Sequence, residues 1–334
     1  MIVAQAGRLV AVARDGDLAS TVVEGTADLG TGASLAPDSI FYVGSIAKQF
    51  VAACVLLLAD DGALALDDTA RRWVPELPAW GDEVTVRELA HHTAGLPPPP
   101  YFADGLSPAG VPAWGNADRL ARVLAVADLV RPPGTAYAYT NHGYTVLGEI
   151  VARASGTSVA GCANERLFAP LGMTDSFFRD AETPLPDRAA RGHFDANDGT
   201  TCVEPARFHA VGAGGLWTTA ADLARWDAAA YDPSHVAARI TERGALTDGT
   251  PIHYAWGISV RTHRGQPIHS HGGSFPGWAS KMVRFPAQRT TVIVLANRED
   301  LDVSGLAFET ADQVLGDVLD PDAPHADHTF DGVT

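Results

Sequence analysis

Ser45 and Lys48 stand three residues apart at the start of the apolar segment F-Y-V-G-S-I-A-K-Q-F (41–50). Serine is a weak nucleophile at neutral pH and needs a base within hydrogen-bond distance. Residues i and i+3 of a helix lie on the same face, so the hydroxyl and the amine can meet there. Burial of the helix favours the neutral amine, which can accept a proton. The spacing indicates nucleophilic catalysis by serine, although a helix-capping serine followed by a surface lysine gives the same pattern.

A second segment whose residue types could take part in a reaction is P-G-T-A-Y-A-Y-T-N-H-G-Y (133–144), in which one residue separates Tyr139 from Asn141. A phenol close to an ammonium group can lose its proton and act as a base. An amide can orient a lysine or a substrate carbonyl. The alternative is an aromatic loop that packs on the core.

Histidines raise the question of a metal site. In H-S-H-G-G-S-F-P-G-W (269–278), His269 and His271 have the spacing of one strand face, and the paired glycines allow a substrate to approach the backbone. No carboxylate or third ligand is nearby, so we expect no metal. The adjacent rings of His91 and His92 diverge in most backbone conformations, which predicts a structural role for both.

The composition is that of a globular protein with an acidic surface. Of the 334 residues, 46% are hydrophobic and 19% are charged, and the formal net charge is −16. Phosphate backbones and anionic membranes require a basic face, and the sequence has no cluster of Lys and Arg. Nucleic acid and membrane insertion are therefore not expected.

The cysteines and the N-terminus bear on the cellular compartment. Cys54, Cys162 and Cys202 are few, odd in number and widely spaced, which fits neither a disulfide framework nor a zinc site. Residues 1–10 lack the features of a secretory signal, and the longest apolar run, 50–59, is too short to span a membrane. The default expectation is a cytoplasmic protein, or a secreted one if a leader has been removed.

Strand-like segments lie at both ends of the chain, with helical segments between them. Asp15-Gly16 separates two β-prone runs and predicts a hairpin, because glycine tolerates the positive φ of a tight turn. Three further strands are predicted at 255–263, 280–286 and 290–296. Apolar residues at helical spacing predict helices at 45–61, 84–92, 144–155, 218–226 and 304–318.

These elements predict an α+β fold in a single domain. Both chain ends contribute to one antiparallel sheet, in a sheet lobe of residues 1–43 and 252–320. A mainly helical lobe, 44–251, is inserted between the two parts of the sheet lobe. Residues 321–334 are expected to form a flexible tail.

The three motifs in this order resemble those of the serine β-lactamase and penicillin-recognising family, on its class C, esterase and D-peptidase side. The family pattern is Ser-x-x-Lys, then Tyr-x-Asn, then Lys- or His-x-Gly, and it falls here on S-I-A-K (45–48), Y-T-N (139–141) and H-G-G (271–273). The resemblance extends over nearly the whole chain through the segments at 38–50, 56–68, 84–97, 212–226 and 284–297.

The resemblance implies a β-lactamase/transpeptidase-like fold and a role for each motif. It implies that Ser45 is the nucleophile that is acylated. Lys48 and Tyr139 would share the proton transfers, and Asn141 would orient Lys48 or the substrate.

It also implies how the acyl-enzyme would be stabilised and released. The backbone N–H groups of Ser45 and of Ser274, which follows Gly273, would form an oxyanion hole, and water would release the acyl group. No cofactor is implied. The implied partner is a small ester or amide, and the oligomeric state is not readable from the sequence.

One departure narrows the expected substrate. His271 stands where β-lactamases carry a permanent cation that binds the carboxylate of penicillin-like substrates, and a mostly neutral imidazole binds it less well. Ester or small-amide hydrolysis is therefore expected rather than β-lactamase or DD-peptidase activity. The chain also begins almost at its first strand, without the helix that relatives often place there, which leaves the packing of the C-terminal helix open.

Two alternatives use the same fold. An acyltransferase would pass the same acyl group to an amine or an alcohol. A non-catalytic ligand-binding or sensor module would have no turnover, but here every catalytic position is filled. An α/β-hydrolase is not supported, because the sequence has no G-x-S-x-G motif.

Overall fold

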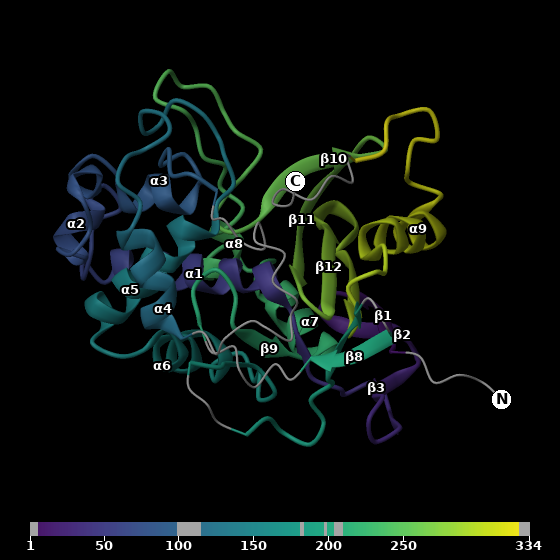
Figure 1. The fold of residues 1–334 in the computed structure, drawn as a ribbon. Helices are drawn as coiled ribbons and strands as arrows, with labels where there is room; N and C mark the ends of the chain where they lie inside the picture. Colours follow the sequence, from purple (N-terminus) through teal and green to yellow (C-terminus); the bar gives the residue numbers. More distant parts are fainter. Residues whose placement is uncertain (1–5, 99–114, 181–183, 197–198, 204–209, 327–334) are drawn as a thin grey trace.

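A six-stranded antiparallel sheet forms the centre of the protein (Figure 1). The computed structural model describes residues 6–98, 115–180, 184–196, 199–203 and 210–326. The strand order is β10-β11-β12-β13-β1-β2. Their bounds are β10 Ser259–His263, β11 Gln266–Phe275, β12 Trp278–Phe285, β13 Thr290–Ala296, β1 Arg8–Arg14 and β2 Asp17–Glu24.

The two ends of the chain meet in the middle of this sheet. β1 pairs with β13 in antiparallel register, with Val10 opposite Val294. The turn between β1 and β2 has φ of 53° at Asp15 and 91° at Gly16, which are the positive values that a tight hairpin requires. The predicted hairpin and the predicted sheet from both chain ends are confirmed.

One face of the sheet is covered by the C-terminal helix α9, Val303–Leu315. Val283 and Val294 of the sheet share a buried cluster with Ala307, Phe308 and Ala311 of this helix. The helix lies over this face of the sheet (Figure 1), and its apolar side chains pack directly on the strands. The packing of the C-terminal helix, which the sequence left open, is therefore against the sheet.

The other face meets the helical part of the chain through η1, Gly44–Ile46, and α7, Ala220–Ala229; α1, Ala47–Asp60, continues directly from η1. Met282, Ile293 and Leu295 of the sheet belong to the same buried core as Phe50 and Val51 of α1. α1 also packs against α5, α6 and α8 (Figure 1). A helix enclosed on all sides must be apolar around its circumference, as the sequence of this segment predicted.

The remaining elements surround α1 or lie beside the sheet. The helices are α2 Ala70–Trp73, α3 Val86–Ala90, α4 Asn116–Leu124, α5 Asn141–Ser155, α6 Val159–Ala163, α7 Ala220–Ala229 and α8 Val236–Arg239. The short turns are η1 Gly44–Ile46, η2 Ala79–Asp82, η4 Asn164–Phe168 and η6 Pro286–Gln288. The small sheets are formed by β5 Phe41–Tyr42, β9 Leu216–Thr218 and β6 Phe177–Phe178; by β3 Thr26–Asp28 and β4 Ala33–Ser34; and by β7 Gly192–Ala196 and β8 Gly199–Val203.

One helix and one strand begin at residues other than the predicted ones. α5 begins three residues before the predicted 144, because the Thr140 side chain accepts a hydrogen bond from His142 N and caps the helix at that point. β10 begins at Ser259 rather than at 255, after an isolated bridge between Tyr254 and Ser259.

The helices of the described ranges also answer the question of membrane spans. None is both long enough and apolar enough to cross a bilayer. The lobe boundaries remain a prediction, and most of the predicted tail, from residue 327, lies outside the described residues.

Candidate active site

Ser45 lies in the turn η1, and Lys48 lies on the first turn of α1. Lys48 Nζ is 2.8 Å from Ser45 Oγ. Lys48 is fully buried, whereas Ser45 is 9% exposed and so stays reachable. The predicted contact between hydroxyl and amine is therefore present.

Lys48 Nζ has two further partners, and both are oxygens that can only accept. It donates to Asn141 Oδ1 at 2.8 Å and to the main-chain oxygen of Ala213 at 2.8 Å. Burial, and next to it the charge of Arg119, holds the pKa of Lys48 well below its ordinary value. A neutral amine keeps two hydrogens, which these two oxygens take, so its lone pair faces Ser45 Oγ.

Tyr139 lies beside the same amine. Lys48 Nζ is 4.9 Å from the centroid of the Tyr139 ring and 5.5 Å from that of Tyr144. Asn141, which the sequence placed on a loop with Tyr139, is the first residue of α5. Folding thus brings the hydroxyl, the amine and the phenol-bearing ring together from distant parts of the chain.

β11 runs directly against the turn that carries Ser45. Gly44 has φ of 52°, and a Cβ at this position would lie 3.0 Å from Ser274 N. A Cβ at Gly273 would collide with the carbonyl oxygen of Val43. The absence of a side chain at Gly273 therefore admits the protein's own backbone, and Ser274 N lies next to the residue that precedes Ser45.

His271 lies beside Tyr139, with ring centroids 6.1 Å apart. Its Nδ1 lies 2.6 Å from the Gly272 carbonyl oxygen, which can only accept, so Nδ1 carries the proton. Its Nε2 forms a hydrogen bond with the Tyr254 hydroxyl at 2.9 Å. These two hydrogen bonds engage both ring nitrogens of His271, so the two-histidine pattern does not supply a pair of metal ligands. Burial, and next to it the charge of Arg284, lowers the pKa of His269 to about 4.

Another group of possible ligands lies between β10 and α9. Among the described residues, His263, Asp312 and His325 have ligand atoms within 4.8 Å of one another. His263 Nδ1 accepts from Ala326 N at 3.1 Å, so Nε2 carries the proton and donates to Asp312 at 2.9 Å. Arg264 also donates to Asp312 at 2.8 Å. A protonated Nε2 and a guanidinium on the carboxylate disfavour a divalent cation, so this group fits a structural network.

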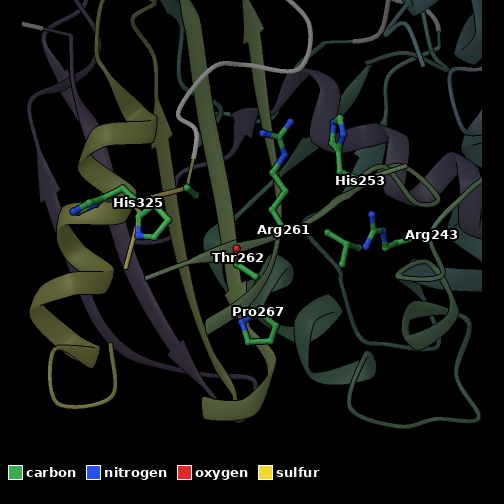
Figure 2. Close-up of a pocket in the computed structure, with 9 residues that line it drawn as sticks. Arg243, His253, Arg261, Thr262, Pro267 and His325 are labelled. Atoms are coloured by element: carbon green, nitrogen blue, oxygen red, sulfur yellow. The ribbon is translucent and has the colours of Figure 1, made fainter. Parts of the chain in front are cut away.

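A pocket of about 560 Å³ lies along the edge strand β10 (Figure 2). None of its lining residues is acidic or belongs to the site around Ser45; they are Arg243, His253, Val260, Arg261, Thr262, Pro267, Pro324, His325 and Ala326. One lining residue, His253, contacts Tyr137, with ring centroids 4.6 Å apart.

Five aromatic residues that the sequence offers as possible walls of an acyl pocket divide into three groups. Trp217 and Trp278 are each 1% exposed, with ring centroids 5.3 Å apart, and are therefore core residues. Phe275 is half-buried, with its ring 5.4 Å from that of Tyr42. The remaining candidates, Tyr101 and Phe102, lie outside the described residues, as do two of the four prolines of 97–100.

Two contributors to the site were not predicted from the sequence. Ala213 acts through a main-chain oxygen, which no side-chain motif reveals, although the segment 212–226 had been noted for its resemblance. Arg119 affects the charge state of Lys48 from α4, and its only signal was a helical segment rich in charge.

The chain is similar in sequence to hydrolases. The sequence profile of the Beta-lactamase family matches residues 3–314. Penicillin-binding protein 4* of Bacillus subtilis (strain 168) is 28% identical over 92% of this chain and 71% of that protein. The D-aminopeptidase of Brucella ovis is 28% identical over 93% of this chain, which spans only 60% of that protein's length.

Solved structures share the fold. An octameric penicillin-binding protein homologue from Pyrococcus abyssi superposes with a TM-score of 0.83 at 24% identity, covering 96% of this chain and 75% of the other. D-amino acid amidase from Ochrobactrum anthropi SV3, complexed with L-phenylalanine, gives a TM-score of 0.77 at 24% identity, covering 94% of each chain.

Proposed function

Because the chain belongs to the Beta-lactamase family, we propose that it is a metal-independent serine hydrolase that forms an acyl-enzyme on Ser45. The observation that carries the proposal is the 2.8 Å contact between Lys48 Nζ and Ser45 Oγ. Asn141 and Ala213 occupy the other two positions around this amine. A surface lysine after a capping serine would have neither burial nor these partners.

Acylation begins when Ser45 Oγ attacks the substrate carbonyl carbon while its proton passes to neutral Lys48. The carbonyl oxygen becomes an oxyanion, for which the N–H groups of Ser45 and Ser274 are the donors. Removal of one such donor typically costs about 3 to 4 kcal/mol of transition-state stabilisation. The proton on Lys48 then passes, directly or through Tyr139, to the leaving alcohol or amine as its bond to the acyl carbon breaks.

Deacylation reverses these roles. A water molecule passes a proton to neutral Lys48, directly or through Tyr139, which releases its own phenolic proton to Lys48 as it takes the new one, and attacks the acyl carbon; Lys48 then returns the proton to Ser45 Oγ as the ester bond breaks. The Tyr139 ring, 4.9 Å from Lys48 Nζ, lies where it can take part in both half-reactions.

The proposed substrate class depends on the residue type at the third motif. His271, bonded to Tyr254 and Gly272, offers no permanent charge to a substrate carboxylate. Small esters and small amides therefore fit better than penicillin-like substrates. Amides of D-amino acids are the first to test, because relatives are named D-aminopeptidase and D-amino acid amidase.

The experiment compares the wild type with Ser45→Ala. Both are incubated with a serine-reactive phosphonate, short-chain nitrophenyl esters and D-amino acid amides, while intact mass and product release are followed. The wild type should gain one adduct and turn over, and Ser45→Ala should do neither. Ser234→Ala, at an exposed serine, is the control and should behave like the wild type.

Two outcomes would contradict the proposal. Hydrolysis retained by Ser45→Ala would exclude Ser45 as the nucleophile. A wild type that is neither labelled nor active would point to a binding module. Added hydroxylamine or amino acid ester would detect acyl transfer, since its product differs in mass from the hydrolysis product.

A further inference from the structure

His92 occupies an unusual backbone position behind the site. It follows α3 and has φ of 58°, in the left-handed region that residues other than glycine rarely adopt. It is 1% exposed. Such a conformation costs free energy and persists only where the surrounding structure enforces it. The sequence suggested a structural role for this residue, but its contacts point to a more specific one.

His92 binds the Tyr-x-Asn segment on both sides of Tyr139. Ala138 N donates to the main-chain oxygen of His92 at 2.8 Å, and Thr140 N donates to His92 Nδ1 at 3.3 Å. The imidazole also lies against the Tyr139 ring, with centroids 4.3 Å apart. One residue thus holds the backbone before and after Tyr139 and supports its ring.

The imidazole is neutral in this arrangement. Nδ1 accepts from Thr140, so Nε2 carries the proton. Nε2 is buried without a hydrogen-bond partner among the described residues, and the rings of Tyr254 and Tyr144 lie at 4.7 and 5.2 Å. Burial holds the pKa of His92 well below its ordinary value. Protonation of Nδ1 would remove the acceptor for Thr140.

The hydrogen bond from Thr140 to His92 also affects the position of the next residue, Asn141. The Thr140 side chain donates to the Pro97 oxygen at 3.0 Å and accepts from His142 N at 3.2 Å, which starts α5. Asn141 is the next residue, and its amide oxygen accepts from Lys48. The backbone held by His92 therefore carries two of the residues that contact the lysine, Tyr139 and Asn141.

We infer that His92 is a positioning residue that fixes Tyr139 and Asn141 against Lys48 by accepting a hydrogen bond from Thr140 N. The inference rests on the proposed function. It assigns His92 no contact with substrate and no proton transfer.

Three substitutions separate this role from simple packing. In His92→Asn, Oδ1 takes the place of Nδ1 as acceptor, and asparagine tolerates positive φ. In His92→Leu, the side chain branches at Cγ as that of asparagine does, but it has no hydrogen-bond acceptor. His92→Gly lacks the acceptor but adopts this φ without strain, and so it replaces the leucine variant if that protein does not fold.

The measurement is kcat per active site, with sites counted by phosphonate titration so that unfolded protein is not included. We expect His92→Leu and His92→Gly to lose about tenfold to a hundredfold in kcat while KM changes by less than about threefold. His92→Asn should stay within about threefold of the wild type. His91→Asn is the matched control, since His91 is also buried but packs on Trp256, 4.5 Å away, and its kcat should not change.

Two outcomes would overturn the inference. One is a wild-type kcat per titrated site in the variants without an acceptor. The other is an asparagine variant as slow as the leucine variant. Failure of the proposed function looks different, because Ser45→Ala would then retain activity whatever His92 does.

Discussion

The main-chain oxygen of Ala213 accepts a hydrogen bond from Lys48 Nζ at 2.8 Å. The Asn141 amide oxygen also accepts from Lys48 Nζ, so these two oxygens take the two hydrogens of a neutral amine. The third position on the amine nitrogen points at Ser45. The direction of the lysine lone pair is therefore set by two neutral oxygens, whereas its charge state is set by burial and by Arg119.

The first prediction concerns the neutral character of Asn141. Asn141→Asp keeps an acceptor near Lys48 but adds a negative charge, which stabilises the ammonium form and raises the pKa of Lys48. Because catalysis needs the neutral amine, the acid limb of the pH profile of kcat/KM should move upward by about 1 to 3 pH units. A pH–rate profile on a neutral ester measures this. An unmoved acid limb would mean that Lys48 is not the titrating base.

The second prediction concerns Arg119, which lies on α4 and is buried. Its positive charge lowers the pKa of Lys48, so its removal in Arg119→Met should raise that pKa and move the acid limb to higher pH. Arg119→Lys keeps the charge and should move the limb less. The control is Arg122→Met on the same helix, which should leave the limb in place. A shift as large in Arg122→Met as in Arg119→Met would contradict the assignment.

The third prediction concerns the missing cation at the third motif. His271→Lys would place an ammonium where β-lactam-recognising relatives carry one, and its charge can bind a substrate carboxylate. The ratio of kcat/KM for a carboxylate-bearing ester to that for its neutral methyl ester should rise about tenfold. The wild-type ratio is the reference, and His271→Gln controls for loss of the imidazole. An unchanged ratio would show that carboxylate selectivity is not set at this position.

The sequence predicted the parts of the protein in which side-chain type determines position. The hairpin at Asp15-Gly16 and the buried helix of Lys48 follow from turn chemistry and from apolar residues on every face. The contribution of Ala213 could not be predicted, because it depends on where a main-chain oxygen lies after folding.

The contacts of His92 were hidden for a related reason. Two neighbouring histidines show neither the backbone φ nor the segment that each ring will meet, and those are set by long-range packing. Near the third motif, residue type suggested a different position from the one that packing gives. Trp278 has the type expected of a pocket wall, but the packing of three rings places it in the core.

The last prediction concerns the junction between the sheet and the helices. Arg284 of β12 forms an ion pair with Asp227 of α7, and both are almost fully buried. Arg284→Met would leave the Asp227 carboxylate buried without its partner, which should lower the free energy of unfolding by about 3 to 5 kcal/mol. Adding Asp227→Leu removes the orphaned charge, so the double variant should recover much of that loss. Chemical denaturation at neutral pH measures both values. A double variant no more stable than Arg284→Met would show that the cost lies in lost packing rather than in the unpaired charge, since only the charge is relieved by the second substitution.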